Sequence, residues 1–109
     1  MARKLRVQFE GAIYHVTARG VERRIIFDDD RDREHFVQRL KEGIEACGVR
    51  LYLFCLMTNH FHFLVHQKEE DTIDRFINSL GTRYTMYFNK KYKRVGPMFQ
   101  SVYKAVLVA

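Results

Sequence analysis

Long apolar stretches are absent from this sequence. No run of apolar residues approaches the ~18 that a membrane-spanning helix needs, and no hydrophobic signal segment follows Met1. Only two cysteines occur, Cys47 and Cys55, and they lack the CxxC spacing of redox and zinc motifs. Both stand among apolar residues, so we interpret them as small core residues in a reducing compartment. These absences predict a cytoplasmic protein without a membrane contact.

Internal repeats, low-complexity segments and linkers are also absent. The 109 residues fit one domain, and a domain of this size buries roughly 65% of the surface that its unfolded chain exposes. That is enough for one core, so we expect one functional site. Hydrophobic residues make up 47% of the chain, with nine phenylalanines and six tyrosines, as in a folded globular domain rather than a disordered segment.

Positive charge is in excess. The 19 lysines and arginines outnumber the 13 acidic residues and leave a net charge of +6, which favours an anionic partner through counterion release and long-range attraction. Charge kept for solubility would explain the surplus equally well. Residues 90–94 favour the first interpretation, because they carry four cations where the end of a helix needs fewer. We therefore expect phosphate contacts at these residues.

The apolar pattern predicts four strands and two helices in the order βαββαβ. Aromatic and β-branched residues bracketed by glycines mark the first strand, and apolar residues spaced by three and four mark both helices. The aspartates at 28–30 are interpreted as caps of the first helix rather than as a metal site. The expected strands are residues 12–19, 49–57, 60–67 and 98–108, and the expected helices end at Gly48 and at about Tyr92.

This order, with short connections, is typical of the ferredoxin-like α+β fold, a four-stranded antiparallel sheet with two helices on one face. The first and third strands are expected to be central neighbours. The second strand is apolar on both faces, which predicts cover on both sides of the sheet. We assign Leu51, Leu53, Cys55 and Met57 to one face of this strand and Tyr52, Phe54 and Leu56 to the other.

Two histidines lie one residue apart in the third strand. Because side chains alternate along a strand, His60 and His62 point to one face, shared with His66, while Phe61, Phe63 and Val65 point to the other. Either histidine alone would be read as a partly exposed residue with a hydrogen-bonded neighbour. The pair favours a metal site but supplies only two ligands. His15 on the first strand is either a third ligand or a hydrogen-bonded sheet residue.

The histidine block resembles that of a known family. CLMTNHFHFLV at 55–65 is similar to "CLMPNHxHLLV" of the REP-associated tyrosine transposases, in which His-hydrophobic-His is the signature of the HUH single-strand transposase superfamily. GAIYHVTARG at 11–20 resembles the family's "GAxYHVTxRG". RYTMYFN at 83–89, with GPMFQ at 96–100, resembles its "RYTxxFN…RxGHLFQ". The resemblance extends over nearly the whole chain.

The resemblance implies metal-dependent cleavage and strand transfer of single-stranded or hairpin DNA. His60 and His62, with a third polar ligand, would hold Mg²⁺ or Mn²⁺, which polarises the scissile phosphate. A tyrosine hydroxyl would attack the phosphorus and leave a 5′-phosphotyrosine and a free 3′-OH. The candidate DNA-binding residues are Arg19, Arg23, Arg24, Asn59, Lys90, Lys91, Lys93, Arg94 and Lys104.

The chain departs from the family pattern in three places. The family's catalytic tyrosine lies on a helix after the fourth strand, whereas this sequence ends at Ala109, so we expect a single domain, 1–109, truncated before that helix, with no catalytic tyrosine of its own. Ser101 and Val102 replace a glycine and an arginine of "FQGRYK". Thr58 and Pro97 replace a proline and a histidine. The absent helix, or a second copy in a homodimer, would cover the apolar sheet face.

Two other functions fit parts of the pattern. A non-catalytic module for single-stranded nucleic acid, such as an RRM, shares the topology, but the aromatic RNP pattern is lacking and the histidine pair would be unexplained. A phosphoesterase with two HxT motifs would use His15 and Thr17 in the first motif, but the second would lack its hydroxyl at His62. The transposase interpretation accounts for more of the sequence than either.

Overall fold

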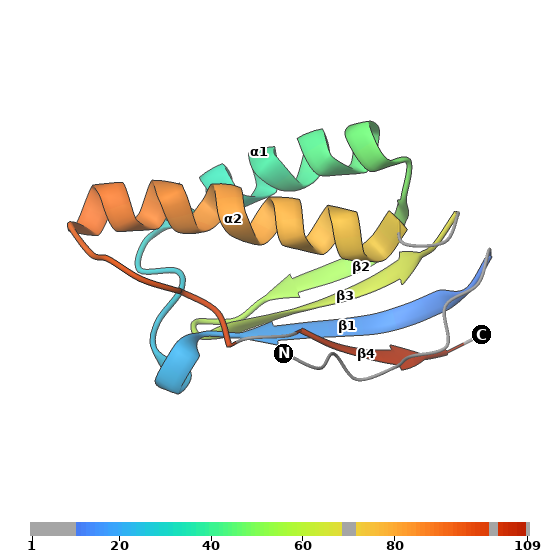
Figure 1. The fold of residues 1–109 in the computed structure, drawn as a ribbon, viewed down its shortest axis with the longest axis horizontal. Coiled ribbons are helices and arrows are strands. Elements are labelled where there is room, and N and C mark those ends of the chain that lie inside the picture. The colour runs from blue at the N-terminus through green and yellow to red at the C-terminus, as the bar shows by residue number, and fades with distance from the viewer. Residues whose placement is uncertain (1–10, 69–71, 101–102, 109) are drawn as a thin grey trace.

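The computed structural model describes residues 11–68, 72–100 and 103–108. Its order of elements confirms the predicted βαββαβ arrangement and α+β fold (Figure 1). The elements are β1 (Ile13–Arg19), the 3-10 helix η1 (Val21–Arg23), α1 (Asp30–Cys47), β2 (Arg50–Leu56), β3 (His60–His66), α2 (Thr72–Tyr92) and β4 (Lys104–Leu107). Among these described elements, no helix has the length and apolar character that a bilayer requires.

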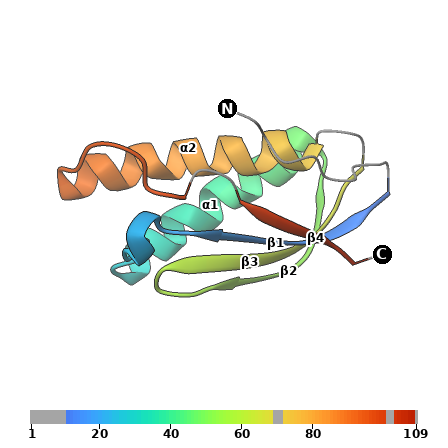
Figure 2. The same cartoon turned by 60° about the horizontal axis from the view of Figure 1, so that its bottom comes forward.

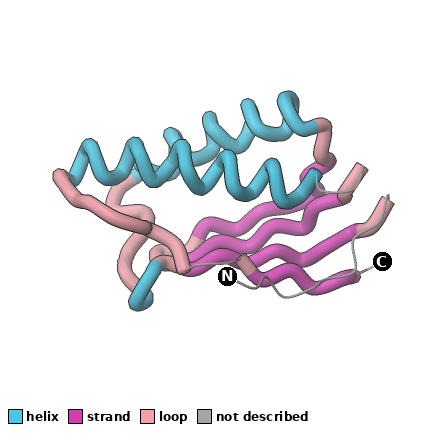
Figure 3. Tube along the Cα trace, in the orientation of Figure 1, coloured by secondary structure: helices cyan, strands magenta, loops and turns pink. Residues whose placement is uncertain are grey.

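The four strands form one sheet in the order β2-β3-β1-β4, with every neighbouring pair antiparallel. As predicted, β1 and β3 are the central strands. Both α1 and α2 lie on the same face of the sheet (Figures 1 and 3). Turning the molecule brings the opposite face into view, where no described helix lies over β1 and β3 (Figure 2). One face of the central strands therefore supports the core and the other is available for a site.

Aromatic side chains dominate the core between the sheet and the helices. Phe61 and Phe63 of β3 are buried, as the alternating pattern predicts. Phe36 of α1 packs on Phe61 with ring centroids 5.2 Å apart and meets Tyr84 of α2 edge to face at 5.1 Å. The Tyr84 hydroxyl donates to the Ile26 carbonyl at 2.5 Å, which gives this buried polar group its partner. Tyr84 is thus a core residue.

The acidic residues before α1 cap the helix, which confirms that interpretation. Asp29 is the N-cap: its carboxylate accepts from the Asp32 backbone N–H at 2.9 Å, and the Asp32 carboxylate accepts from the Asp29 N–H at 3.4 Å. This reciprocal capping box satisfies two backbone donors at the start of the helix. The helix ends at Gly48, whose φ of 70° is the left-handed conformation that favours glycine.

The second strand contains a bulge that the sequence pattern did not predict. Leu51 pairs with Val65, and Leu53 pairs with Leu64, so Tyr52 is an extra residue between two ladder positions. A bulge reverses the alternation of side chains beyond it. The prediction that Leu51 and Leu53 share a face is therefore wrong: Leu51 packs against the core, whereas Leu53 is 63% exposed. The cover expected over this strand stays a prediction.

The fourth strand is shorter than predicted. It covers Lys104–Leu107, not residues 98–108, and positions 101, 102 and 109 of the predicted strand lie outside the described residues. Residues 98–100 are fastened to the end of β1 by separate hydrogen bonds, from the Val21 N–H to the Met98 carbonyl and from the Gln100 N–H to the Arg19 carbonyl. Together with one isolated bridge, between Gly20 and Phe99, these bonds attach residues 98–100 to the end of β1 outside the described strand.

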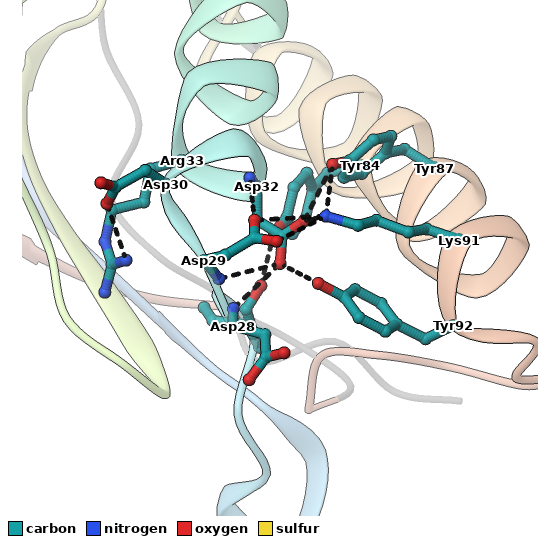
Figure 4. A network of polar contacts seen from close by, with 10 residues as sticks. Asp28, Asp29, Asp30, Asp32, Arg33, Tyr84, Tyr87, Lys91 and Tyr92 are labelled. Carbon is teal, nitrogen blue, oxygen red and sulfur yellow. Dashed lines mark hydrogen bonds and ion pairs between the residues drawn. The ribbon is translucent and has the colours of Figure 1, made fainter.

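A buried carboxylate joins the two helices (Figure 4). Asp32, in the first turn of α1, is fully buried and accepts hydrogen bonds from three side chains near the end of α2. Tyr87 and Tyr92 donate their hydroxyls at 2.8 and 2.7 Å, and the Lys91 ammonium lies 2.8 Å from the carboxylate. The Lys91 ammonium also lies 3.0 Å from Asp29. The charge of Lys91 is therefore neutralised by Asp29 and Asp32 at the helix interface. The sequence pattern did not predict this pairing.

These contacts determine the ionisation of Asp32. Burial alone raises the pKa of this carboxyl, but hydrogen bonds from Lys91, Tyr92, the Asp28 backbone and Tyr87 outweigh it and hold the pKa far below its usual range. In return, burial and the hydrogen bond to Asp32 raise the pKa of Tyr92 to about 12. The folded protein thus keeps an ionised Asp32 under conditions where an unfolded chain would protonate it.

We predict that Asp32→Asn lowers the free energy of unfolding by about 3 kcal/mol at neutral pH, because it leaves the Lys91 charge without its buried partner. An unfolded aspartate titrates near about 3.9, and the folded pKa lies lower, so the stabilisation from Asp32 is complete above that pH and is lost as the pH falls towards the folded pKa. Urea unfolding between pH 2.5 and 7, roughly the span of carboxyl titration, should show a shallower acid slope in the variant.

The control is Asp30→Asn, which removes a carboxylate whose side chain is 96% exposed and lies 3.8 Å from Arg33. It should change stability by less than about 0.5 kcal/mol. Equal pH dependence of the wild type and Asp32→Asn would contradict the role given to Asp32.

Candidate functional site

The pairing of β1 with β3 builds a polar surface on the face away from the helices. His60 lies opposite Arg19, His62 opposite Thr17 and His66 opposite Ile13. The three histidines share this face, as predicted, and are partly exposed. The rings of His60 and His62 have centroids 4.9 Å apart and stand nearly perpendicular, at 83°. His66 lies at the other end of β3, where its ring is 6.4 Å from that of Tyr52.

Asn59 orients the ring of His60. The Asn59 amide nitrogen donates to the Arg23 carbonyl at 3.3 Å, which turns its carbonyl oxygen towards His60. That oxygen lies 2.8 Å from Nδ1 of His60 and can only accept, so Nδ1 carries the proton. The neutral ring then presents its lone pair at Nε2. A second residue that fixes the tautomer in this way is a common feature of metal-binding histidines.

His62 has its own partners on β1. Its Nδ1 lies 3.0 Å from Nε2 of His15 and 3.3 Å from the Thr17 hydroxyl, and the His15 and His62 rings stack at 5.1 Å. His15 is therefore the hydrogen-bonded sheet residue of the two alternatives considered for it. Burial, followed by the nearby His60, His15 and Arg19, lowers the pKa of His62. The ring is thus kept in the neutral form that metals bind.

The histidine pair could provide two of the ligands of a metal site. The Nδ1 atoms of the two rings are used in the contacts to Asn59, His15 and Thr17, so Nε2 of each ring would be the ligand atom when Nδ1 carries the proton. Across the described residues, no cluster of three or more His, Cys, Asp or Glu side chains has the arrangement of a metal site. Imidazole ligands alone would suit zinc as readily as Mg²⁺ or Mn²⁺, so the expectation of Mg²⁺ or Mn²⁺ rests on the family resemblance.

Eight of the nine predicted DNA-binding residues fall into two regions, and the ninth, Asn59, contacts His60. Arg19, Arg23 and Lys104 line one pocket beside the histidine pair, together with Thr17 and Gln100. The second region is the far end of α2. There Arg24 and Arg94 line a shallow pocket with Phe88 and Tyr92, Lys90 and Lys93 are exposed, and Lys91 binds Asp29 and Asp32. The structure therefore brings together only part of the predicted set.

The sequence analysis missed Thr17 and Gln100. Thr17 could have been found, because it shares its face of β1 with Arg19 and lies opposite His62 in the predicted pairing of the central strands. Gln100 could not, since its position depends on the hydrogen bond from its N–H to the Arg19 carbonyl, outside any regular strand.

The turn after β1 holds Arg23 in an uncommon conformation. Glu22 and Arg23 have φ values of 54° and 59°, in the left-handed region that non-glycine residues rarely adopt. The Arg23 N–H donates to the Gly20 carbonyl at 3.0 Å, and the Arg23 carbonyl accepts from Asn59. At Gly20 a Cβ would lie 2.3 Å from the Arg24 carbonyl oxygen, so the turn requires glycine there. Asn59 thus supports both His60 and Arg23.

Comparison with known protein families adds the decisive observation: residues 8–108 match the model for IS200-like transposases. The chain belongs to this family. The resemblance seen in the histidine block is thereby confirmed at the level of the family. A search of curated proteins found no match.

Two solved structures resemble this chain. One is a REP-associated tyrosine transposase bound to a REP hairpin, with a TM-score of 0.82 and 11% identity; the match covers 100% of this chain but 63% of that one. The other is a protein of Deinococcus radiodurans R1 described as a transposase, with a TM-score of 0.72, 16% identity and coverage of 99% and 87%. At these identities the likeness establishes a shared fold.

All six tyrosines of this transposase chain lie in the described residues, and none is placed beside the histidine pair. Tyr14 is buried on the helix side of β1. Tyr84, Tyr87 and Tyr92 bind Ile26 and Asp32 in the helix layer, and Tyr103 donates to Asp74. Tyr52 of β2 lies near His66, at the end of β3 away from the histidine pair. The described site therefore offers imidazoles and cations but no phenolic nucleophile.

We predict that ¹⁵N NMR at a pH of about 8, where imidazoles are neutral, will show His60 protonated at Nδ1 and unprotonated at Nε2. Asn59→Ala removes the acceptor and should shift His60 towards the Nε2-protonated form, while the signals of His66 stay unchanged. An Nε2-protonated His60 in the wild type would contradict the orientation described for Asn59.

Proposed function

We propose that this chain forms the metal-holding and DNA-binding part of a transposase that cleaves and transfers single-stranded DNA. The observation that carries the proposal is the placement of His60 and His62 on one exposed face, with Nδ1 of both rings engaged and three cations beside them. Metal-dependent phosphodiester chemistry uses such a combination of positive charge and metal ligands. The membership of the IS200-like transposase family supports the same conclusion.

The proposed metal is Mg²⁺ or Mn²⁺, held by Nε2 of His60 and His62 and by a third polar ligand. When bound, it would supply Lewis-acid polarisation of a phosphate oxygen. The residues of this chain would contribute the rest: Asn59 holds the His60 tautomer, and His15 with Thr17 holds the ring of His62. Arg19, Arg23 and Lys104 would neutralise the DNA backbone next to the pair.

The nucleophile is proposed to be a tyrosine supplied from outside these 109 residues, because the six tyrosines of the chain have other positions. Its oxygen would form a bond to phosphorus as the bond from phosphorus to the 3′-oxygen breaks. The tyrosine hydroxyl would give up its proton, and the leaving 3′-oxygen would take one up, so that the products are a 5′-phosphotyrosine and a free 3′-hydroxyl. The solved REP-associated transposase carries a REP hairpin, which supports hairpin DNA with single-stranded flanks as the substrate proposed here.

The first test is metal binding. The double variant His60→Ala/His62→Ala should lose the heat of Mn²⁺ binding in calorimetry, with an affinity lowered more than about tenfold. The matched control is His66→Ala, since His66 shares the strand and the face but lies at the other end of β3. Unchanged Mn²⁺ binding in the double variant would show that the pair is not the metal site.

The second test concerns the nucleic acid. At matched salt, fluorescence anisotropy should give tighter binding to a DNA hairpin with single-stranded flanks than to a blunt duplex of equal length or to the corresponding RNA. Because duplex and single strands differ in phosphate density, the comparison is made at several salt concentrations, so that the electrostatic part of each affinity can be separated. Preference for duplex or for RNA would contradict the proposed substrate. Binding of the hairpin without Mn²⁺ binding would favour a non-catalytic binding module instead.

A further inference from the structure

A basic pocket of about 260 Å³ opens beside the histidine pair. It lies on the same side of the sheet as the pair, next to η1. Its lining residues are Thr17, Arg19, Arg23, Gln100 and Lys104. These residues come from β1, η1, β4 and the segment before β4, so the pocket exists only in the folded chain.

The sheet register links this pocket directly to the histidine pair. Thr17 pairs with His62 on one side and with Lys104 on the other, so these three residues form one row across the sheet. Arg19 pairs with His60, and its carbonyl accepts the hydrogen bond from the Gln100 N–H. Two parallel rows therefore lead from the histidines into the pocket. Thr17 lines the pocket, and its hydroxyl lies 3.3 Å from Nδ1 of His62, so this residue connects the pocket to the histidine pair.

The charge of the pocket is uncompensated. Its lining includes three cations and no carboxylate, and among the described residues no acidic side chain pairs with Arg19, Arg23 or Lys104. Lys91 differs from these cations, because its charge is met by Asp29 and Asp32. Cations held close together without a counterion repel one another, and an anion in the pocket would relieve that repulsion.

The backbone conformation of η1 fixes the position of Arg23. The two consecutive left-handed residues of η1 are fastened by Gly20 and by the Asn59 side chain, which also orients His60. Backbone conformations of this kind persist only where neighbouring contacts hold them, and they concentrate at binding sites. Asn59 thus holds both Arg23, which lines the pocket, and His60, which is a proposed metal ligand.

We propose that this pocket binds a backbone phosphate of the DNA strand adjacent to the phosphate that is cleaved. Guanidinium groups bind phosphate oxygens through paired hydrogen bonds, and the amide of Gln100 and the hydroxyl of Thr17 add neutral donors. A phosphate held here would set which phosphodiester of the strand reaches His60 and His62. The inference rests on the function proposed above and assigns to Thr17 and Gln100 a role in positioning the strand.

The test compares two double variants that remove the same charges. Arg23→Gln/Lys104→Gln changes two exposed residues of the pocket, and Arg31→Gln/Lys41→Gln changes two exposed residues of α1 on the helix side. Binding of a fluorescent oligothymidylate is measured by anisotropy in EDTA at several salt concentrations. The pocket variant should bind about tenfold more weakly at low salt, and the slope of log K against log salt should fall by about 0.7, the value for one lost phosphate contact on a single strand.

The α1 variant should retain nearly all of the affinity and slope. A charge-preserving variant, Arg23→Lys/Lys104→Arg, should recover the slope, which separates phosphate contact from a disturbed fold. Competition with inorganic phosphate tests the ligand: phosphate should displace the oligonucleotide from the wild type at lower concentrations than an equal ionic strength of chloride does.

Equal losses in the pocket and α1 variants would overturn the pocket and leave only a general effect of charge. No loss in the pocket variant would overturn it as well. Because the measurement is made in EDTA, its result is independent of metal binding. Failure of the Mn²⁺ calorimetry contradicts the proposed function alone, and equal binding by the two double variants contradicts the pocket alone.

Discussion

The antiparallel pairing of β1 with β3 is the interaction on which the rest of the structure depends. Because side chains alternate along both strands, one register decides two surfaces at once. It places Val16 opposite Phe63 under the helices and Thr17 opposite His62 on the other face. A slip of one residue would bury the histidines and expose the phenylalanines. Burial of the apolar side chains therefore fixes the register that places the histidine pair, although these core residues are not themselves part of the site.

A series of hydrogen bonds connects the helix layer to the histidine end of the sheet. Tyr84 of α2 donates to the Ile26 carbonyl, and the Ile26 N–H donates to the Thr58 carbonyl at 2.9 Å, in the turn between β2 and β3. The next residue in that turn is Asn59, which contacts His60 and Arg23. The helix interface, locked by Asp32, thus supports the turn from which the site is built. Residues remote from the histidines should influence the site through this path.

The sequence predicted those features that depend on local periodicity. The alternation in β1 and β3 was enough to identify the histidine face, and spacing by three and four identified both helices. The bulge at Tyr52 was not predictable, because an extra residue leaves the apolar composition of the strand unchanged. Asp32 stands within an amphipathic helix, and its partners are 55 to 60 residues further along the chain. For the same reason Lys91 could be recognised as basic but not as already paired.

The central claim is that the histidine face holds a divalent cation, and paramagnetic NMR tests it most directly. Substoichiometric Mn²⁺ broadens the signals of nuclei near the ion that it binds. We predict that amide signals of His60 and His62 broaden first, together with those of Thr17 and Arg19 on the neighbouring strand. The exposed carboxylates at 28–30, which cap α1, are where non-specific binding of Mn²⁺ would be seen. Broadening centred on those aspartates, with the β1 and β3 signals unaffected, would contradict the metal-holding role of the histidine pair.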